Sequence, residues 1–231
     1  MAHYKKTAAL IFLLGALTFG QEKFEVKTLS TNYNLKVETE NCADSHCNGK
    51  TQFFLFWKNA SKPFQIFKFD NTLLLLDKSR HVEIAKIKDK PKGKRSNIYL
   101  EDFNFDGNDD LALPDGANGG YASQSYKIYL YSPGKKKFVY NSDFTKLVQS
   151  PYMGIFVTNN KKKTLEVFWK SGCCMHYSET YKIIKNRPEK ISEIGEFYDL
   201  HGNGKTQFET KKLIRGKWRT WIKSVPIKQS K

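Results

Sequence analysis

The residues with the clearest chemical pattern form a run from Asp102 to Asp110, which reads Asp-Phe-Asn-Phe-Asp-Gly-Asn-Asp-Asp. Oxygen-bearing side chains stand at its first, third, fifth and ninth places, and a glycine stands at the sixth. A calcium ion takes about six to eight oxygen ligands, and this spacing supplies them because alternate residues face inward while the glycine permits a sharp turn. The predicted calcium ligands are the side chains of Asp102, Asn104, Asp106 and Asp110 and the backbone carbonyl of Asn108.

The residues on either side of this run predict strands rather than helices. The apolar segments 98–100 and 111–113 flank it, and neither shows a helical period. Leu113 stands where a helix-loop-helix calcium site has its bidentate glutamate. Because Asp, Asn and Gly also dominate turns that bind no metal, an Asx-rich turn without calcium is the alternative interpretation.

The beginning of the chain predicts export. Lys5 and Lys6 precede an apolar run over residues 8–17 and a small-residue exit before Gln21, which is the pattern of a secretory signal peptide. We therefore expect residues 1–20 to be removed and residues 21–231 to form a single all-β domain, periplasmic or secreted. The apolar run is too short to span a bilayer and no later segment is long enough, so we predict no transmembrane segment.

The charge of the chain bears on its partners. The formal net charge is +16, and it falls to +14 when Lys5 and Lys6 are removed. A surface this basic favours an anionic cell-wall polymer or another polyanion as a partner. Only five of the cations are arginine, the residue that recognises phosphates and bases in a bidentate manner. We therefore predict no specific nucleic-acid partner.

The mature chain contains four cysteines, Cys42, Cys47, Cys173 and Cys174. An even number in an oxidising compartment favours disulfides. A bond between the neighbours Cys173 and Cys174 would strain the peptide between them. We therefore predict two bridges that link the turn at residues 42–47 to the turn at 173–174. The alternative is a metal site, because His46 and His176 stand beside cysteines.

The rest of the chain consists of short aromatic and β-branched runs separated by Gly, Pro, Asn or Lys. They predict strands at 52–57, 64–69, 126–131, 155–158, 164–169, 177–184 and 218–225. The sequence predicts a short helix over residues 141–149 and an exposed loop or a joint between subdomains over residues 86–97. The hexapeptide Asn-Gly-Lys-Thr-Gln-Phe occurs at Asn48–Phe53 and at Asn203–Phe208, and each copy predicts a turn that leads into a strand.

Two parts of the chain resemble a bacterial family of exported β-proteins. These parts are the run from Tyr99 to Tyr131 and the segment Ser171–His176 followed by Tyr181. Members of that family combine a calcium loop of the FG-GAP and VCBS type with similarity to periplasmic lysozyme inhibitors. The resemblance implies an all-β fold of antiparallel sheets, propeller-like or sandwich, with little helix. It also implies that a loop of the protein enters the cleft of a peptidoglycan hydrolase.

The function expected from this resemblance is that of an exported calcium-binding protein that binds and inhibits a lysozyme-like peptidoglycan hydrolase. The stretch Gly119–Tyr126 matches the inhibitors' contact loop. Its expected partner-binding residues are Tyr121, Ser123, Ser125 and Tyr126. The alternative is a carbohydrate- or cell-surface-binding module with structural calcium. A hydrolase is a third hypothesis. The sequence contains no nucleophile elbow, zinc-binding histidine pair or phosphate loop, which disfavours catalysis. We therefore predict that the chain is not an enzyme.

Overall fold

The computed structural model describes residues 22–26, 32–82, 84–85, 97–199 and 202–227. The predicted signal peptide lies outside the described residues, as does the predicted joint at 86–97 except for Asn97. Within the described ranges, no helix is long and apolar enough to cross a membrane.

The first sheet has the order β1-β2-β3-β4, with antiparallel pairs throughout. Its strands are β1 (Glu22–Val26), β2 (Tyr33–Thr39), β3 (His46–Trp57) and β4 (Gln65–Leu75). The alternation of residues explains why one face is buried. In β2, Tyr33, Leu35 and Val37 point into the protein, while the residues between them are more exposed.

The second sheet has the order β5-β6-β7-β8-β9, in which only the β5–β6 pair is parallel. Its strands are β5 (Ile84–Ala85), β6 (Ile98–Glu101), β7 (Asp110–Pro114), β8 (Tyr126–Ser132) and β9 (Lys137–Tyr140). Two short 3-10 turns, η2 (Gly120–Ala122) and η3 (Pro133–Lys135), lie on either side of β8. β6 and β7 are buried at every position, because this sheet is covered on both faces.

The third sheet has the order β10-β11-β12-β13-β14-β15 and is antiparallel throughout. Its strands are β10 (Val157–Asn159), β11 (Thr164–Ser171), β12 (Met175–Ile184), β13 (Arg187–Tyr198), β14 (Lys205–Ile214) and β15 (Lys217–Pro226). The single α-helix of the described residues, α1 (Ser142–Lys146), precedes it.

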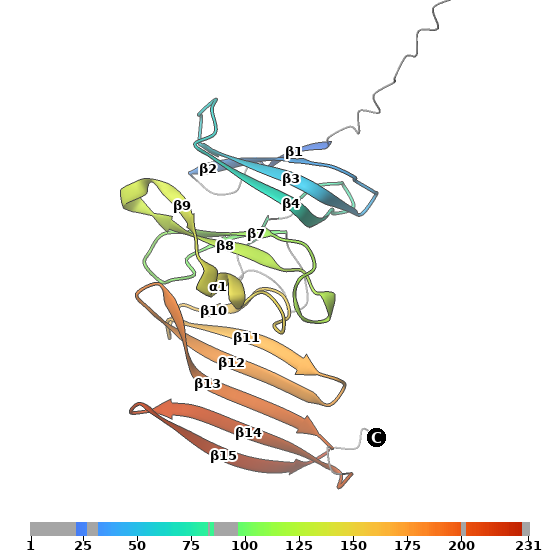
Figure 1. Cartoon of the computed structure of the whole chain (residues 1–231), viewed down its shortest axis with the longest axis vertical. Coiled ribbons are helices and arrows are strands. Elements are labelled where there is room, and N and C mark those ends of the chain that lie inside the picture. The colour runs from blue at the N-terminus through green and yellow to red at the C-terminus, as the bar shows by residue number, and fades with distance from the viewer. Residues whose placement is uncertain (1–21, 27–31, 83, 86–96, 200–201, 228–231) are drawn as a thin grey trace, which may run out of the picture.

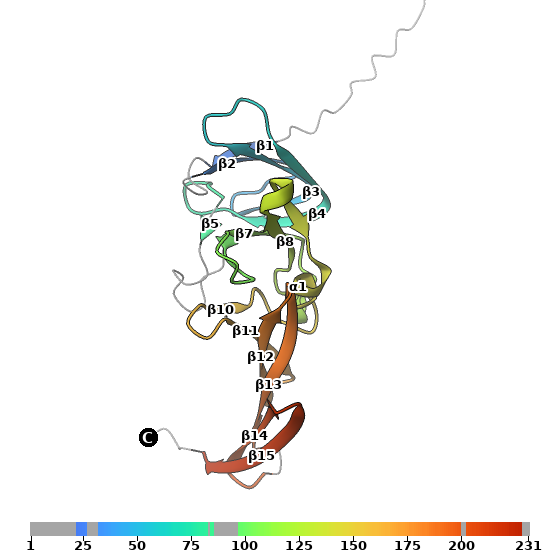
Figure 2. The same ribbon diagram turned by 90° about the vertical axis from the view of Figure 1, so that its left-hand side faces the viewer.

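Two hydrophobic cores hold the sheets together in chain order (Figure 1). The first core lies between the first two sheets and includes Phe53, Leu55 and Leu111. The second core joins the opposite face of the second sheet to α1 and to the upper strands of the third sheet, through residues such as Phe103, Phe144 and Leu165. β14 and β15 extend beyond both cores as the end of the third sheet (Figure 2).

The all-β fold of antiparallel sheets with little helix is therefore confirmed, and its stacked sheets correspond to a sandwich. The predicted short helix is also present, because Asn141 caps α1 by accepting hydrogen bonds from the amides of Asp143 and Phe144. The turn at the second hexapeptide precedes β14 as predicted. The first hexapeptide does not form a turn. It lies inside β3, where the pairing with β4 shifts between Gly49 and Thr51, so Gly49 serves a β-bulge.

The predicted cysteine pairing is wrong. Cys42 is bonded to Cys47, and Cys173 is bonded to Cys174. The reason is the layering of the fold: Cys42 and Cys47 face each other across a turn of the first sheet, whereas the other pair lies at the β11–β12 turn of the third sheet. The second sheet stands between the two turns (Figure 1). All four cysteines are oxidised, so they offer no thiolate for the alternative metal site.

Candidate metal loop and partner-contact surface

The predicted calcium run forms the loop that joins β6 to β7. Its side chains turn inward and accept backbone hydrogen bonds. Asp102 accepts the amides of Asp106 and Gly107 at 3.0 and 2.9 Å. The Asn104 side-chain oxygen accepts the same Asp106 amide at 3.1 Å. Asp102 and Asn104 therefore converge on one point of the loop, and the loop joins strands as the sequence predicts.

Asp106 and Asn108 complete this arrangement. One oxygen of Asp106 accepts the amide and the side-chain nitrogen of Asn108, both at 2.9 Å. The other accepts the side-chain nitrogen of Asn104 at 2.8 Å. Asn104 also donates to the side-chain oxygen of Asn186 at 3.0 Å, so the β12–β13 turn supports the loop. The same contacts are those of a metal-free Asx turn, the alternative interpretation.

Asp110 has a different environment from the other predicted ligands. Its side chain is fully buried and accepts three backbone amides, those of Phe103 and Asn104 at 2.9 and 3.3 Å and that of Tyr131 at 2.8 Å. Burial raises the pKa of Asp110 to about 8, although the hydrogen bonds act in the opposite direction. Asp110 thereby braces the start of the loop against β8.

The donor set can be compared with what calcium requires. Among the described residues, no group of three or more His, Cys, Asp or Glu side chains has an arrangement that could hold a metal ion. The run nevertheless offers carboxylate and amide oxygens, the hard ligands that calcium prefers. The side chains of Asp102, Asn104 and Asp106 supply oxygens of this kind. Both oxygens of Asp110 already accept backbone amides.

The segment after β7 is packed tightly through two glycines. A Cβ at Gly119 would lie 2.3 Å from the Ser123 hydroxyl, and one at Gly120 would lie 2.2 Å from the carbonyl oxygen of Pro151. The Gly120 amide also donates to the carbonyl of Tyr152 at 2.6 Å. Only glycine permits this approach. The segment is therefore fixed on the chain at residues 150–154 and does not protrude freely.

Tyr121 is the residue that this packed segment exposes. Its side chain is 60% exposed, and its backbone is left-handed with φ 54°, as is that of Ala122. Two consecutive non-glycine residues in this region are uncommon, and such strain concentrates at functional sites. The Tyr121 hydroxyl accepts the Gly172 amide at 2.7 Å, and Lys170 Nζ lies 4.7 Å from the centre of its ring.

These contacts join the two segments that carry the family resemblance. The β11–β12 turn holds Gly172 and the Cys173–Cys174 disulfide, and Tyr121 lies against it. We call Tyr121, Lys170 and residues 172–174 the Tyr121 surface.

The other expected contact residues do not share this exposure. Ser123 is partly buried and its hydroxyl accepts the Gly154 amide at 3.2 Å. Ser125 is fully buried and donates to the carbonyl of Asp115 at 2.7 Å. Tyr126 is buried in the second core, where its hydroxyl donates to Gln124 at 2.9 Å. The expectation that Ser125 and Tyr126 contact a partner is therefore corrected, since β8 begins at Tyr126 and points its ring inward.

The predicted calcium loop precedes β7, and the segment that carries Tyr121 follows it (Figure 1). β7 itself spans roughly 13 Å. An effect of an ion in the loop on the Tyr121 surface would therefore be transmitted along β7.

A buried carboxylate that the sequence did not reveal lies on β12. Glu179 accepts hydrogen bonds from the hydroxyls of Tyr152 and Tyr181 at 2.9 and 2.5 Å and from the Trp169 indole at 3.2 Å. Lys190 lies 3.4 Å away as its counter-ion. Burial raises the pKa of both tyrosines, so their hydroxyls stay protonated as donors. Through Tyr152, the network connects residues 150–154 to the third sheet. Because Gly120 is hydrogen-bonded to Tyr152, the network also helps to hold the segment that carries Tyr121.

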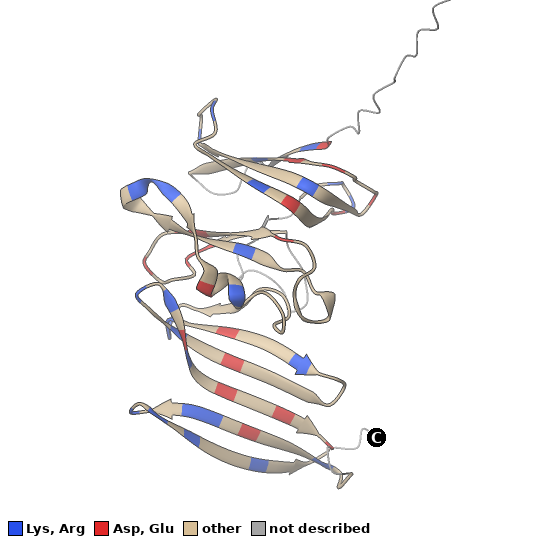
Figure 3. Ribbon diagram, in the orientation of Figure 1, with Lys and Arg blue, Asp and Glu red and all other residues tan. Residues whose placement is uncertain are grey.

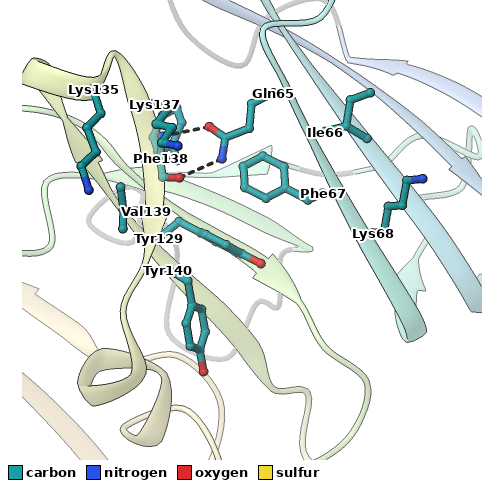
Figure 4. A pocket seen from close by; sticks show the side chains of 10 residues that line it. All are labelled: Gln65, Ile66, Phe67, Lys68, Tyr129, Lys135, Lys137, Phe138, Val139 and Tyr140. Atoms are coloured by element: carbon teal, nitrogen blue, oxygen red, sulfur yellow. Dashed lines mark hydrogen bonds between the residues drawn. The ribbon is translucent and has the colours of Figure 1, made fainter.

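A cavity that the sequence also did not reveal opens where β4 approaches β9 (Figure 4). It measures about 450 Å³. Phe67, Tyr129 and Tyr140 supply aromatic rings. The described residues that line the cavity include three lysines, Lys68, Lys135 and Lys137, and no carboxylate. The Gln65 side chain closes one side with two hydrogen bonds, of 2.8 and 2.9 Å, to the backbone of Phe138.

Comparisons with known proteins give one structural likeness. No protein-family model matches the chain, and no curated protein matches it. A solved structure of a Xanthomonas Type IV secretion system related protein superposes on it with a TM-score of 0.67 and 20% sequence identity. The match covers 86% of this chain and 92% of that chain. At this identity, the likeness shows that the two proteins share a fold.

Proposed function

We propose that the chain is an exported calcium-binding β-protein that binds and inhibits a lysozyme-like peptidoglycan hydrolase through the Tyr121 surface. The observation that carries the proposal is the geometry of Tyr121. A large, rigid, amphipathic side chain is exposed on a segment that is already ordered by glycine packing. Such a residue loses little entropy when a partner binds, which is the property of an interface anchor.

The place of this residue supports the same proposal. Tyr121 lies against the β11–β12 turn, so the two segments with family resemblance form one continuous surface. Lys170 adds a positive charge beside the ring. An acidic or neutral hydrolase would be favoured over a basic one, because the mature chain carries +14 and like charges slow association.

Calcium has a structural role in this proposal. Asp102, Asn104 and Asp106 would hold it, and the ion would supply a fixed positive charge that neutralises the loop carboxylates. Asn108 would contribute its carbonyl, and Asp110, both of whose oxygens already accept backbone amides, would hold the loop against β8 beside the ion. The ion would stabilise the β6–β7 connection, and through it the second sheet.

The direct test is inhibition of a panel of lysozymes and other muramidases by the mature protein in the presence of calcium. We expect at least one enzyme to be inhibited at micromolar protein. Tyr121→Ala should relieve that inhibition, whereas Tyr140→Ala, which removes another exposed tyrosine, should not. If no enzyme of the panel is inhibited, the inhibitor function is rejected.

The second candidate is a module that binds an anionic cell-wall polymer, and the cavity in Figure 4 favours it. The rings of Tyr129 and Tyr140 lie 5.8 Å apart at its wall, and aromatic faces can stack on sugar rings. The three lysines would meet carboxylate or phosphate groups of the polymer. Binding to purified anionic polymer that is lost in Tyr140→Ala and retained in Tyr121→Ala would support this function over the first.

A further inference from the structure

The β14–β15 hairpin exposes large apolar side chains to an unusual degree. In β15, every residue is exposed except Val225. Trp218, Trp221 and Ile222 are 47%, 49% and 63% exposed, and Leu213 and Ile214 at the end of β14 are exposed as well. Large apolar side chains gathered in this way on one hairpin mark an interaction site.

The apolar residues emerge on both faces of the hairpin. Successive residues of a strand point to opposite faces, and directly paired residues share a face. Trp218 pairs with Leu213, and Ile222, four residues further on, lies on the same face as Trp218. Trp221 pairs with Thr210 and therefore points to the opposite face. Within the described part of the chain, neither core extends over a face of the hairpin, which projects beyond both (Figure 2).

The hairpin is also strongly basic. Residues 205–226 contain seven lysines or arginines and one glutamate, a net charge of +6. Figure 3 shows these cations distributed along β14 and β15. Arg215 and Lys217 are in or beside the turn that also carries Ile214 and Trp218. Trp with Lys or Arg is the composition of segments that settle at a membrane surface.

The two-sided exposure distinguishes between possible occupants. A folded protein or a glycan chain that docks on a sheet covers one face and leaves the other in water. A lipid surface into which the hairpin dips covers both faces together. The +6 charge then requires that the surface be anionic.

The depth of entry is limited by the backbone. β15 is the last strand of its sheet among the residues that the structure describes, so its outer edge carries amide and carbonyl groups that no described strand pairs. Such groups are costly in hydrocarbon, where no water can bind them. The hairpin must therefore stay in the headgroup region, with only its apolar side chains reaching the acyl boundary.

We propose that the β14–β15 hairpin is a peripheral membrane anchor that docks the chain on an anionic lipid bilayer. The ligand is a surface of anionic phospholipid headgroups. Trp218, Trp221 and Ile222 enter the interface, and the cations bind the headgroups. This anchor does not depend on the proposed inhibition, and it would leave the Tyr121 surface at the β11–β12 turn free for a partner.

The test is sedimentation of the full chain with vesicles of phosphatidylcholine alone or with added phosphatidylglycerol, at low and high salt. We expect at least about tenfold stronger binding to the anionic vesicles, weakened by salt because exposed charges are screened. The variant Trp218→Ser/Trp221→Ser/Ile222→Ser should lose this binding. Val157→Ser/Ile184→Ser, which removes exposed apolar residues elsewhere on the third sheet, should keep it.

Tryptophan fluorescence of the unchanged chain provides a second readout that needs no variant. Trp57 and Trp169 are stacked on Phe64 and Tyr177, so they should not respond. A blue shift on adding anionic vesicles, with quenching by brominated lipids, is expected from Trp218 and Trp221. Equal binding to both vesicle types, absence of binding, or unchanged binding by the triple variant would overturn the anchor. Capture of a soluble acidic protein or anionic glycan without vesicle binding would also overturn it.

Discussion

Replacement of Gly120 by alanine tests whether the segment that carries Tyr121 is held rigidly. An ideal Cβ at this position lies 2.2 Å from the carbonyl oxygen of Pro151 and 3.3 Å from Met153 Cγ. The first atom belongs to the backbone, so it cannot rotate away as a flexible side chain would. Overpacking of this kind costs about 1–3 kcal/mol. Loss of the hydrogen bond from the Gly120 amide to Tyr152 adds about 0.5–1.5 kcal/mol.

The combined effect of Gly120→Ala is a loss of about 1.5–4.5 kcal/mol in the free energy of unfolding. For a domain of this size, the melting temperature shifts by about 2–4 °C per kcal/mol, so we expect a decrease of roughly 3–18 °C. Urea denaturation and calorimetry measure both quantities. Gly134→Ala is the matched control, because a Cβ there would meet nothing within 4 Å. If Gly120→Ala is as stable as that control, the segment that carries Tyr121 is not held rigidly and Tyr121 is not preorganised for a partner.

Three further predictions concern the metal, the tyrosines and the disulfides. Calcium at about a hundred times its Kd should stabilise the chain against unfolding by about 2.7 kcal/mol. Calorimetry should show that Asp106→Ala abolishes this gain. A melting temperature that neither calcium nor a chelator changes would argue against the site. Burial, together with the neighbouring Tyr131, raises the pKa of Tyr33 to about 12. The folded state therefore keeps a proton that the unfolded state loses above about pH 10. The free energy of unfolding should fall as the pH rises from about 10 to 12. Tyrosinate absorbance and denaturation at each pH check this, and full titration near pH 10 without loss of stability would contradict it. Non-reducing peptide mapping should recover a bridge between Cys42 and Cys47. A bridge from either residue to the β11–β12 turn would refute this pairing. The variant Cys42→Ser/Cys47→Ser should lose about 2 kcal/mol of stability in the loop-entropy model.

Local patterns in the sequence predicted the elements well. In β8, Tyr126, Ile128 and Leu130 share one buried face and Tyr129 and Tyr131 share the other, as alternation requires. The loop from Asp102 to Asp110 joins strands because its flanks lack a helical period. These features depend on neighbours in the sequence.

Features that depend on distant parts of the chain could not be predicted in the same way. The cysteine pairing requires knowledge of which sheet separates the two turns. Tyr126 is buried because it packs in the second core. A tyrosine that follows a glycine-rich segment does not by itself indicate whether its side chain is buried or exposed. Glu179 pairs with Trp169 and Tyr152 only once β11, β12 and residues 150–154 are brought together. Glu179 and Tyr181 are two residues apart on β12 and therefore share a face, which is the single local indication of this contact.

The most direct test of the proposed inhibition is the inhibition constant of Tyr121→Ala against an enzyme that the unchanged chain inhibits, measured with calcium present. An interface anchor contributes about 2 kcal/mol or more, so we predict that inhibition weakens about thirtyfold or more. The melting temperature should change little, because the side chain is exposed and its hydroxyl makes a single hydrogen bond to Gly172. Tyr140→Ala should inhibit as well as the unchanged chain. An inhibition constant for Tyr121→Ala within twofold of that of the unchanged chain would contradict the assignment of this surface.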